Sequence, residues 1–455
     1  MNRTENKNDF SKGNITKTLL GLAIPMTLAQ LVNVLYNVID RIYLSRIQGA
    51  SMDALTGVGV CLPVITMIIA FANLIGTGGA PLFSIERGRQ NTKEAGEIMG
   101  NCLTLLLIFS GCLTVIGLII QEPLLRLLGA SDRTLPYASQ YLTIYLFGTV
   151  FVLVSLGLNS FINAQGFGKT GLFTVLIGAG INMGLDPVFI FGLHMDVRGA
   201  AIATVISQGV AALWTLSFLT GKKALIRLEL RNMKMKAART GKILMLGLSG
   251  FTMSVTNSVV QMVCNATLQT FGGDIYVGIM TIINSIREVI SAPITGLTNA
   301  GQPIMGYNYG AGEYIRVKKT IRVLTMIAIA YTMAIWAVVS VFPEAFIHLF
   351  SQDEQVKLLG RSAIHIYFFG FFMMAFQFCG QCTFTALGKA KRAVFFSLFR
   401  KIVIVVPLTL LLPGLFGMGV NGVFWAEPVS NAIGGLACFI TMMLTIYRKL
   451  GKEEV

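Results

Sequence analysis

Charge is scarce in this chain. Asp, Glu, Lys and Arg make up 13% of its 455 residues, about half of the roughly 25% that is usual in soluble proteins. The three histidines lie far apart and form no ligand set. The CxxC pair Cys379 and Cys382 has no second pair or histidine cluster beside it, so we expect small packing residues rather than a metal or redox site. Since no HExxH or similar constellation occurs either, the chain is predicted not to be an enzyme and to need no cofactor.

Long apolar runs take up most of the chain. Hydrophobic residues make up 54% of it, and its mean hydropathy is +0.70. The stretches 102–120 and 323–343 contain no charged residue, and a helix needs roughly 20 apolar residues to cross a bilayer. We count about twelve such stretches, at 17–44, 55–83, 98–120, 136–162, 170–193, 198–220, 243–271, 275–307, 320–342, 362–388, 391–413 and 419–447. The alternating pattern of barrel strands is missing, so we predict an all-α polytopic membrane protein that lies in the lipid bilayer.

The net charge of +15 is spread unevenly between alternate loops. If the N-terminus is inside, most basic residues fall on the same side as it, including the dense basic stretch 222–242. This asymmetry is the positive-inside rule, and it predicts that both termini lie in the cytoplasm. The basic stretch is then a solvated linker on that side, and no nucleic-acid partner is predicted.

The second half of the chain repeats the pattern of the first. Pro81 and Pro303 have the same separation along the chain as Gly88 and Gly310. At that same separation, the motif Ile-Tyr-Leu-Phe-Gly at 144–148 returns as Ile-Tyr-Phe-Phe-Gly at 366–370. The period equals about six spans, and an even number gives both copies the same orientation, related by a pseudo-two-fold axis along the membrane normal. We predict an N-lobe at 1–220, a cytoplasmic linker at 221–242 and a C-lobe at 243–455, as in alternating-access transporters.

Acidic residues inside these apolar stretches mark the candidate functional site. They are Asp40, Asp186, Glu288 and Glu427, and charge in a bilayer core is costly and usually functional. The first helix also carries a polar stripe, because residues spaced by three and four share one helix face. The stripe consists of Gln30, Asn33, Asn37 and Asp40, with Tyr36 beside it. Such a stripe must face protein or water rather than lipid.

Asp186 has an amide partner one helical turn away, because Asn182 precedes it by four residues. With the predicted helix directions, Asp40, Asp186 and Thr204 all reach the outer half of the membrane. Two carboxylates, an amide oxygen and a hydroxyl are hard oxygen ligands, which suit Na⁺ or a proton that the acids share. The alternative is a structural polar cluster that holds the N-lobe together.

The charged residues of the C-lobe are open to two interpretations. Glu288 follows Arg287 near the middle of the membrane, where it could attract a cationic substrate or serve as a structural counter-charge. Glu427 is a weaker candidate for either role. Arg400 and Lys401 are expected to extend toward the cytoplasm, as long basic side chains near a membrane surface do.

These motifs resemble those of the multidrug and toxic compound extrusion (MATE) family, over nearly the whole chain. The resemblance rests on the first helix with Pro25 and Asp40, the helix end at 163–166, the helix with Asn182 and Asp186, and the stretches 197–204 and 301–310. The motifs are closest to those of a MepA-like bacterial branch. The resemblance implies a two-lobe exporter of twelve helices that expels small organic cations in exchange for inward H⁺ or Na⁺. We expect it to act as a monomer in the bacterial plasma membrane.

The resemblance also assigns roles to residues. The coupling cation falls to Asp40, Asn182, Asp186 and Thr204, and contact with the substrate is predicted for Asn33, Tyr36, Asn37, Asn284 and Glu288. Some branches carry an acid in helix 7 or helix 10, but 243–271 and 362–388 contain none, so coupling is expected to rest on the N-lobe.

Two other functions compete with efflux. A lipid-linked oligosaccharide or lipid flippase of the same superfamily would need a larger and more cationic cavity, whereas the buried charge here is expected to be mainly acidic, which favours cationic cargo. A membrane-embedded enzyme is less favoured, because no catalytic constellation is present.

Overall fold

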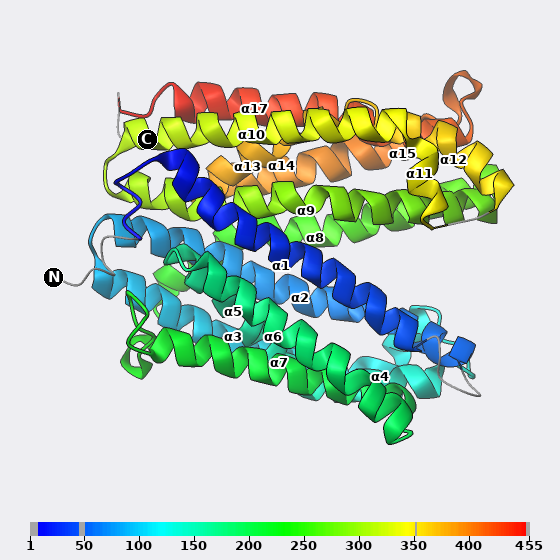
Figure 1. The fold of residues 1–455 in the computed structure, drawn as a ribbon, viewed down its shortest axis with the longest axis horizontal. Coiled ribbons are helices and arrows are strands. Elements are labelled where there is room, and N and C mark those ends of the chain that lie inside the picture. The colour runs from blue at the N-terminus through cyan, green and yellow to red at the C-terminus, as the bar shows by residue number, and fades with distance from the viewer. Residues whose placement is uncertain (1–7, 45–50, 351–352, 452–455) are drawn as a thin grey trace. The chain divides into compact units, whose positions relative to one another are not determined.

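The computed structural model describes residues 8–44, 51–350 and 353–451, and no β-strand occurs among them (Figure 1). The first half of the chain forms α1 (Ile15–Leu44), α2 (Ser51–Gly88), α3 (Thr92–Leu127), α4 (Leu135–Phe147), α5 (Thr149–Ala164), α6 (Gly168–Pro187), η1 (Val188–Gly192) and α7 (Asp196–Thr220). A short turn, η2 (Leu230–Met233), follows in the basic stretch. The second half forms α8 (Ala237–Gly272), α9 (Asp274–Gly310), α10 (Tyr314–Val341), α11 (Pro343–His348), α12 (Glu354–Tyr367), η3 (Phe371–Met373), α13 (Met374–Ala386), α14 (Ala390–Leu398), η4 (Phe399–Val405), α15 (Val406–Leu411), η5 (Leu415–Gly417), α16 (Val420–Ser430), η6 (Asn431–Gly435), α17 (Leu436–Met442) and η7 (Met443–Tyr447).

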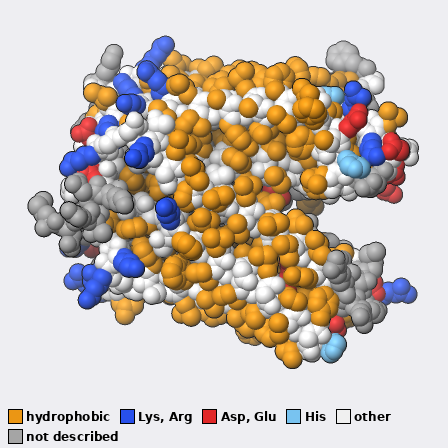
Figure 2. Space-filling model, in the orientation of Figure 1, with side chains coloured by type: hydrophobic (Ala, Val, Ile, Leu, Met, Phe, Trp, Pro, Cys, Tyr) orange, Lys and Arg blue, Asp and Glu red, His pale blue; other side chains and the backbone are white. Residues whose placement is uncertain are grey.

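Within the described residues, 10 helices are long and apolar enough to cross a membrane, and the number rises to 12 if each of two bent helix pairs is one span. Figure 2 shows the corresponding surface, with apolar side chains along the helices and Lys and Arg side chains near helix ends. The prediction of an all-α polytopic fold with about twelve spans is confirmed.

Both bent pairs break at a glycine of the repeated motif. The pair α4 and α5 bends by 55° between Phe147 and Thr149, and the pair formed by α12 and the segment Phe371–Ala386 bends by 41°. Gly148 and Gly370 stand at the breaks as equivalent residues of the repeat, and Gly370 has a φ of 65° that favours glycine. The sequence motif therefore encodes a helix break that recurs in each half.

Helix ends elsewhere follow the same period. α2 and α9 end at Gly88 and Gly310, and α3 and α10 begin four residues later, at Thr92 and Tyr314. Chance similarity between apolar sequences would not align helix ends in this way, so the two halves are copies of one helical pattern.

The chain forms two compact units that exchange the beginnings of two helices. Unit 1 comprises Met1–Asp9 and Leu28–Phe251, and unit 2 comprises Phe10–Thr27 and Thr252–Val455. The first part of α1 thus packs in unit 2, where Leu19 and Leu22 join its buried core, and the first part of α8 packs in unit 1, where Ile243 is fully buried. The boundaries between the compact units therefore fall inside α1 and α8. The boundary between the two copies of the repeat falls instead at the linker.

Arginine side chains fasten the exchanged segments. In unit 1, Arg239 at the start of α8 donates two hydrogen bonds of 2.8 Å to Glu94 and also pairs with Glu97, both at the start of α3. In unit 2, Arg316 at the start of α10 donates at 3.0 Å to the carbonyl of Phe10, which precedes α1. Glu94 and Arg316 hold the same position of the repeat. The same repeat position thus holds an exchanged segment in each unit, through an acidic residue, Glu94, in unit 1 and a basic residue, Arg316, in unit 2.

Glycines allow each exchanged helix to approach its neighbour closely. A Cβ atom added to Gly247 of α8 would collide with the carbonyl oxygen of Leu74 in α2, inside unit 1. Inside unit 2, a Cβ atom on Gly296 of α9 would collide with Thr27 of α1. Leu74 and Gly296 are again separated by one period of the repeat, so the two contacts are equivalent in it.

We expect Gly247→Ala to destabilise the protein, because a backbone carbonyl cannot swing aside and overpacking of this kind costs about 1–3 kcal/mol. Gly21→Ala is the control: Gly21 corresponds to Gly247 in the repeat, but nothing lies within 4 Å of its added Cβ. That change should be neutral or stabilising, since Ala favours a helix over Gly by about 1 kcal/mol. Thermal unfolding of the purified proteins in detergent, followed by circular dichroism, measures both. Equal midpoints for the two variants would contradict the close contact.

Candidate functional site

The candidate cation site lies inside unit 1, where α6 and α7 meet. Asn182 and Asp186 on α6 are 1% and 0% exposed, and Thr204 on α7 is 4% exposed. Asn182 donates through Nδ2 to Asp186 Oδ1 at 3.4 Å and to Thr204 Oγ1 at 3.2 Å. Thr204 in turn donates to the carbonyl of Ala200 at 3.0 Å, so its remaining oxygen lone pair faces the amide. The structure therefore brings these three predicted residues into one hydrogen-bonded group.

Two acceptor oxygens of this group have no hydrogen-bond partner among the described residues. They are Oδ2 of Asp186 and Oδ1 of Asn182, and both are buried. A buried acceptor without a donor is costly, and each such atom calls for an explanation. A cation held between a carboxylate oxygen and an amide oxygen would satisfy both, and hard oxygen donors of this kind fit Na⁺ or a proton.

Asp40 reaches the same group from α1. It is half-buried, and its side chain lies within hydrogen-bonding reach of Asp186. Tyr36, one turn earlier on α1, lies near Asp40, Asp186 and Thr204. The polar stripe of the first helix therefore turns toward α6 and α7, as the spacing of its residues indicates. Two carboxylates thus lie close together, one fully buried and one half-buried.

A proline ends the α-helical hydrogen bonding of α6 beside the site. Pro187 has no N–H to donate to the carbonyl of Met183. After Pro187, the chain continues as a π-helical turn, η1. Turns of this kind are rare and often occur at functional sites. Asp186 therefore immediately precedes the proline that ends α6.

Tyr141 of α4 is a member of the site that the sequence analysis missed. It is 4% exposed, it lies close to Asp40 and Tyr36, and it reaches Thr204. Its ring stacks on Tyr145 with centroids 6.2 Å apart. The available signal was the spacing of four between two tyrosines on an apolar span, because a buried tyrosine hydroxyl needs a polar partner.

A polar pocket adjoins the acids within unit 1. It has about 410 Å³ of atom-free space, and its polar lining consists of Asn33, Tyr36, Ser155, Asn159, Thr174 and Gln208. Tyr36 thus belongs both to the pocket wall and to the acid group. Asn33 and Tyr36, two of the residues predicted to contact cargo, line this pocket. The side chain of Asn37, a third, lies outside the described part of the structure. The lining contains no charged residue.

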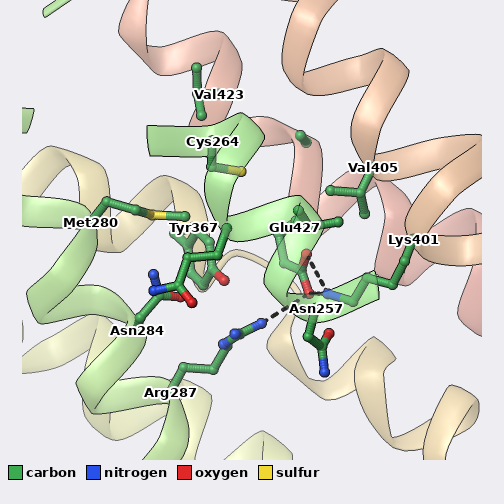
Figure 3. Close-up of a pocket in the computed structure, with 13 residues that line it drawn as sticks. Asn257, Cys264, Met280, Asn284, Arg287, Tyr367, Lys401, Val405, Val423 and Glu427 are labelled. Atoms are coloured by element: carbon green, nitrogen blue, oxygen red, sulfur yellow. Dashed lines mark hydrogen bonds and ion pairs between the residues drawn. The ribbon is translucent and has the colours of Figure 1, made fainter. Parts of the chain in front are cut away.

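A second buried charge cluster lies in unit 2, around Glu427 of α16 (Figure 3). Its carboxylate accepts from Arg400 Nη1 at 3.0 Å and from Lys401 Nζ at 3.2 Å, and Arg287 of α9 lies 3.8 Å away. Arg400 also pairs with Asn431. The expectation that Arg400 and Lys401 extend toward the cytoplasm is wrong: they are 5% and 3% exposed. Pairing with a buried carboxylate holds them inside, because an unpaired charge there would cost far more.

The two C-lobe residues predicted to contact cargo occupy different environments. Asn284 lines a pocket together with Arg287, Lys401 and Glu427. Glu288 is exposed and does not line this pocket, and no hydrogen bond or ion pair joins it to another described residue. Arg287 lies 3.8 Å from Glu427, and the neighbouring charge of Glu288 also acts on it.

The balance of buried charge also differs from the expectation. The acids of unit 1 fit a mainly acidic interior, but the cluster of unit 2 combines one carboxylate with three cationic groups. The assumption that buried charge is mainly acidic is therefore wrong for unit 2. Only the tertiary contacts could show this, because the residues come from helices far apart in the sequence.

A helical membrane protein that is built from a repeat and has buried charged groups in its spans shows the features of a secondary transporter. The family model MatE matches residues 25–188 and 237–411, once in each half. This chain belongs to the MatE family.

Two relatives of known name align with this chain over almost its full length. The multidrug export protein MepA of Staphylococcus haemolyticus is 27% identical over 441 residues, which is 96% of this chain and 94% of the relative. The protein of the same name from Staphylococcus aureus is 22% identical over 96% of this chain and 95% of its own.

Solved structures match the fold. A MATE crystal structure in complex with MaL6 matches with a TM-score of 0.92 at 24% identity, covering 98% of this chain and all of the other. A transporter from Pyrococcus furiosus, described as having a binding pocket of reverse polarity, matches with a TM-score of 0.91 at 24% identity over 98% of this chain and 99% of its own. At this identity the matches establish the fold alone.

Proposed function

We propose that this protein exports lipophilic organic cations across the bacterial plasma membrane in exchange for inward H⁺ or Na⁺. It acts as a monomeric transporter rather than an enzyme, with both termini in the cytoplasm. The relatives named multidrug export protein support efflux of small molecules. The observation that carries the exchange step is the buried group of Asp40, Asn182, Asp186 and Thr204, with its two oxygens that lack donors.

The physical reason for coupling is like-charge repulsion. Two adjacent carboxylates in a medium of low dielectric constant cannot both stay ionised without a bound cation. A proton or Na⁺ between Asp40 and Asp186 would relieve that repulsion and satisfy the oxygens of Asp186 and Asn182. Tyr36 lies next to the acids and also lines the pocket, so loss of the cation would change the position or charge environment of a residue in the pocket wall. Cation occupancy and cargo occupancy can thereby exclude each other.

Transport in proteoliposomes tests the proposal. We expect a pH or sodium gradient, imposed across the membrane, to drive uptake of a cationic dye against its concentration gradient. In cells, overexpression should lower the retention of ethidium compared with vector controls, because the dye is apolar and carries one positive charge. Uptake and retention are read from fluorescence. Equal retention in both strains, together with altered export of lipid-linked sugars, would contradict efflux.

A flippase for lipid-linked oligosaccharides is the second candidate, and one observation favours it. The cluster of unit 2 has three cationic groups around a single carboxylate, and a flippase needs positive charge to hold phosphates. The neutral lining of the pocket in unit 1 and the acids beside it oppose this role, since they would repel a phosphate.

We further propose that Glu288 attracts cargo. The carboxylate of Glu288 is exposed, and no hydrogen bond or ion pair joins it to another described residue, so a cation can approach it. Glu288→Gln should therefore weaken binding of a dicationic substrate more than that of a matched monocation, while H⁺ or Na⁺ exchange continues. Dye-displacement affinities for the two substrates measure the difference. An equal loss for both substrates would rule out the cargo role.

A further inference from the structure

One pocket of unit 2 is richer in hydrogen-bond donors than in acceptors. It has about 350 Å³ of atom-free space, and α8, α9, α12, η4 and α16 all contribute to its wall. Its polar lining consists of Asn257, Gln261, Asn284, Arg287, Tyr367, Lys401 and Glu427. In Figure 3, Arg287 and Lys401 approach Glu427 from different sides, and Asn284 and Tyr367 lie nearby.

Cationic groups outnumber carboxylates around this pocket: Arg287, Arg400 and Lys401 surround Glu427, and Glu288 is the one further acid whose charge acts on Arg287. Glu427 is the one acidic residue in the lining. Its Oε1 already accepts from Arg400 at 3.0 Å and from Lys401 at 3.2 Å, and its Oε2 accepts from Lys401 at 3.3 Å. Arg400 and Lys401 thus already bond to both oxygens of the carboxylate. The third cation, Arg287, lies farther away: its Nη1 is 3.8 Å from Oε1 of Glu427, which is too long for a hydrogen bond.

Donors therefore remain available at the pocket. The side chain of Arg287 is 30% exposed, so its guanidinium can be reached, and among the described residues it donates to no acceptor at hydrogen-bond distance. Nδ2 of Asn284, one turn away on the same helix, is buried and likewise has no partner in the described part of the chain. A guanidinium fork and an amide N–H₂ on one helix face suit an anion with two oxygens.

We propose that this pocket binds the carboxylate group of an organic anion, held between Arg287 and Asn284 with Lys401 behind it. One carboxylate would offset part of the positive excess, and it matches the planar guanidinium in a two-point contact. A phosphate or pyrophosphate fits less well, because its three or more oxygens call for more donor groups than Arg287 and Asn284 supply. The apolar wall residues, including Val260, Met280 and Val423, suit an aromatic or aliphatic body attached to that carboxylate. The site would give the protein an anionic or amphoteric ligand class besides organic cations.

Direct binding to the purified full-length protein in detergent tests this inference without any gradient, so its outcome is independent of antiport. The probes are dansylglycine and dansylglycinamide, which differ in the carboxylate alone, and phenyl phosphate and benzoate serve as competitors. We expect the carboxylate probe to bind at least about tenfold more tightly than the amide, as one charge-assisted contact allows. Arg287→Gln should abolish that preference. Arg361→Gln, which removes an exposed arginine paired with Glu344, should keep it.

The ratio between the two probes is measured within each variant, so a change in stability or in the active fraction does not mimic the result. Equal affinity of the two probes for the wild-type protein would overturn the proposal, because the charges would then be compensated internally. A preference that survives in Arg287→Gln would place the anion elsewhere and would also overturn it. Stronger displacement by phenyl phosphate than by benzoate would replace the carboxylate with a phosphate ligand and refute the class proposed here.

Discussion

Asp186→Asn is expected to abolish gradient-driven efflux and leave expression and folding intact. The amide keeps the size of the side chain and can still bond to Asn182, but it cannot carry the negative charge that holds a proton or Na⁺. Dye uptake into proteoliposomes should fall to the level of protein-free liposomes under either gradient. Binding of a cationic dye without a gradient should persist, because the wall of the pocket in unit 1 is neutral and does not include Asp186.

Asp40→Asn should have the same effect, since the two carboxylates act as one group. Thr174→Val is a matched control, because Thr174 lies in the pocket wall but outside the acid group. It should change dye affinity without uncoupling the exchange. If both aspartate variants transport at the wild-type rate, the cation site has been placed wrongly.

The second large effect is expected for Glu427→Gln, and it concerns stability. The change leaves Arg400 and Lys401 buried without their shared carboxylate, and loss of one partner of a buried ion pair typically costs about 3–5 kcal/mol. We therefore expect a markedly lower midpoint of thermal unfolding for the purified variant in detergent. The midpoint can be followed by the intrinsic fluorescence of the protein.

Two further variants make this result specific. Glu344→Gln removes the carboxylate of the exposed pair with Arg361, where both side chains are more than half exposed, and should change stability by less than about 0.5 kcal/mol. Combining Glu427→Gln with Lys401→Met removes one of the stranded charges and should recover part of the lost stability. A single Glu427→Gln variant as stable as wild type would mean that the cluster is solvated.

Several features of the fold followed from the sequence because they are local. Whether an apolar run can span a bilayer depends on its length, and whether Asn182 and Asp186 share a face depends on a spacing of four. The internal repeat paired Gly88 with Gly310, and both glycines end helices in the structure, although the predicted spans ended at 83 and 307. The same period marked the breaks at Gly148 and Gly370, although the sequence did not show that these glycines bend the helices.

Other features required the tertiary structure because they depend on which helix faces meet. Tyr141 joins the acid group only through the rotation of α4 against α1, which no pattern within α4 determines. The exchange of the first parts of α1 and α8 between the compact units depends on close contacts at Gly247 and Gly296. Neither contact is visible in the composition of a single helix.

By itself, the sequence determined the membrane class, the approximate spans and the repeat, and it singled out the acids of the candidate site in unit 1. Only the tertiary structure decided which charges neutralise one another. Arg400 and Lys401 were expected to extend toward water, but Glu427, far along the chain from both, holds them inside. The physical reason is that a charge interacts with its neighbours in space, over a few ångströms and in a medium of low dielectric constant, and the order of residues along the chain does not specify those neighbours.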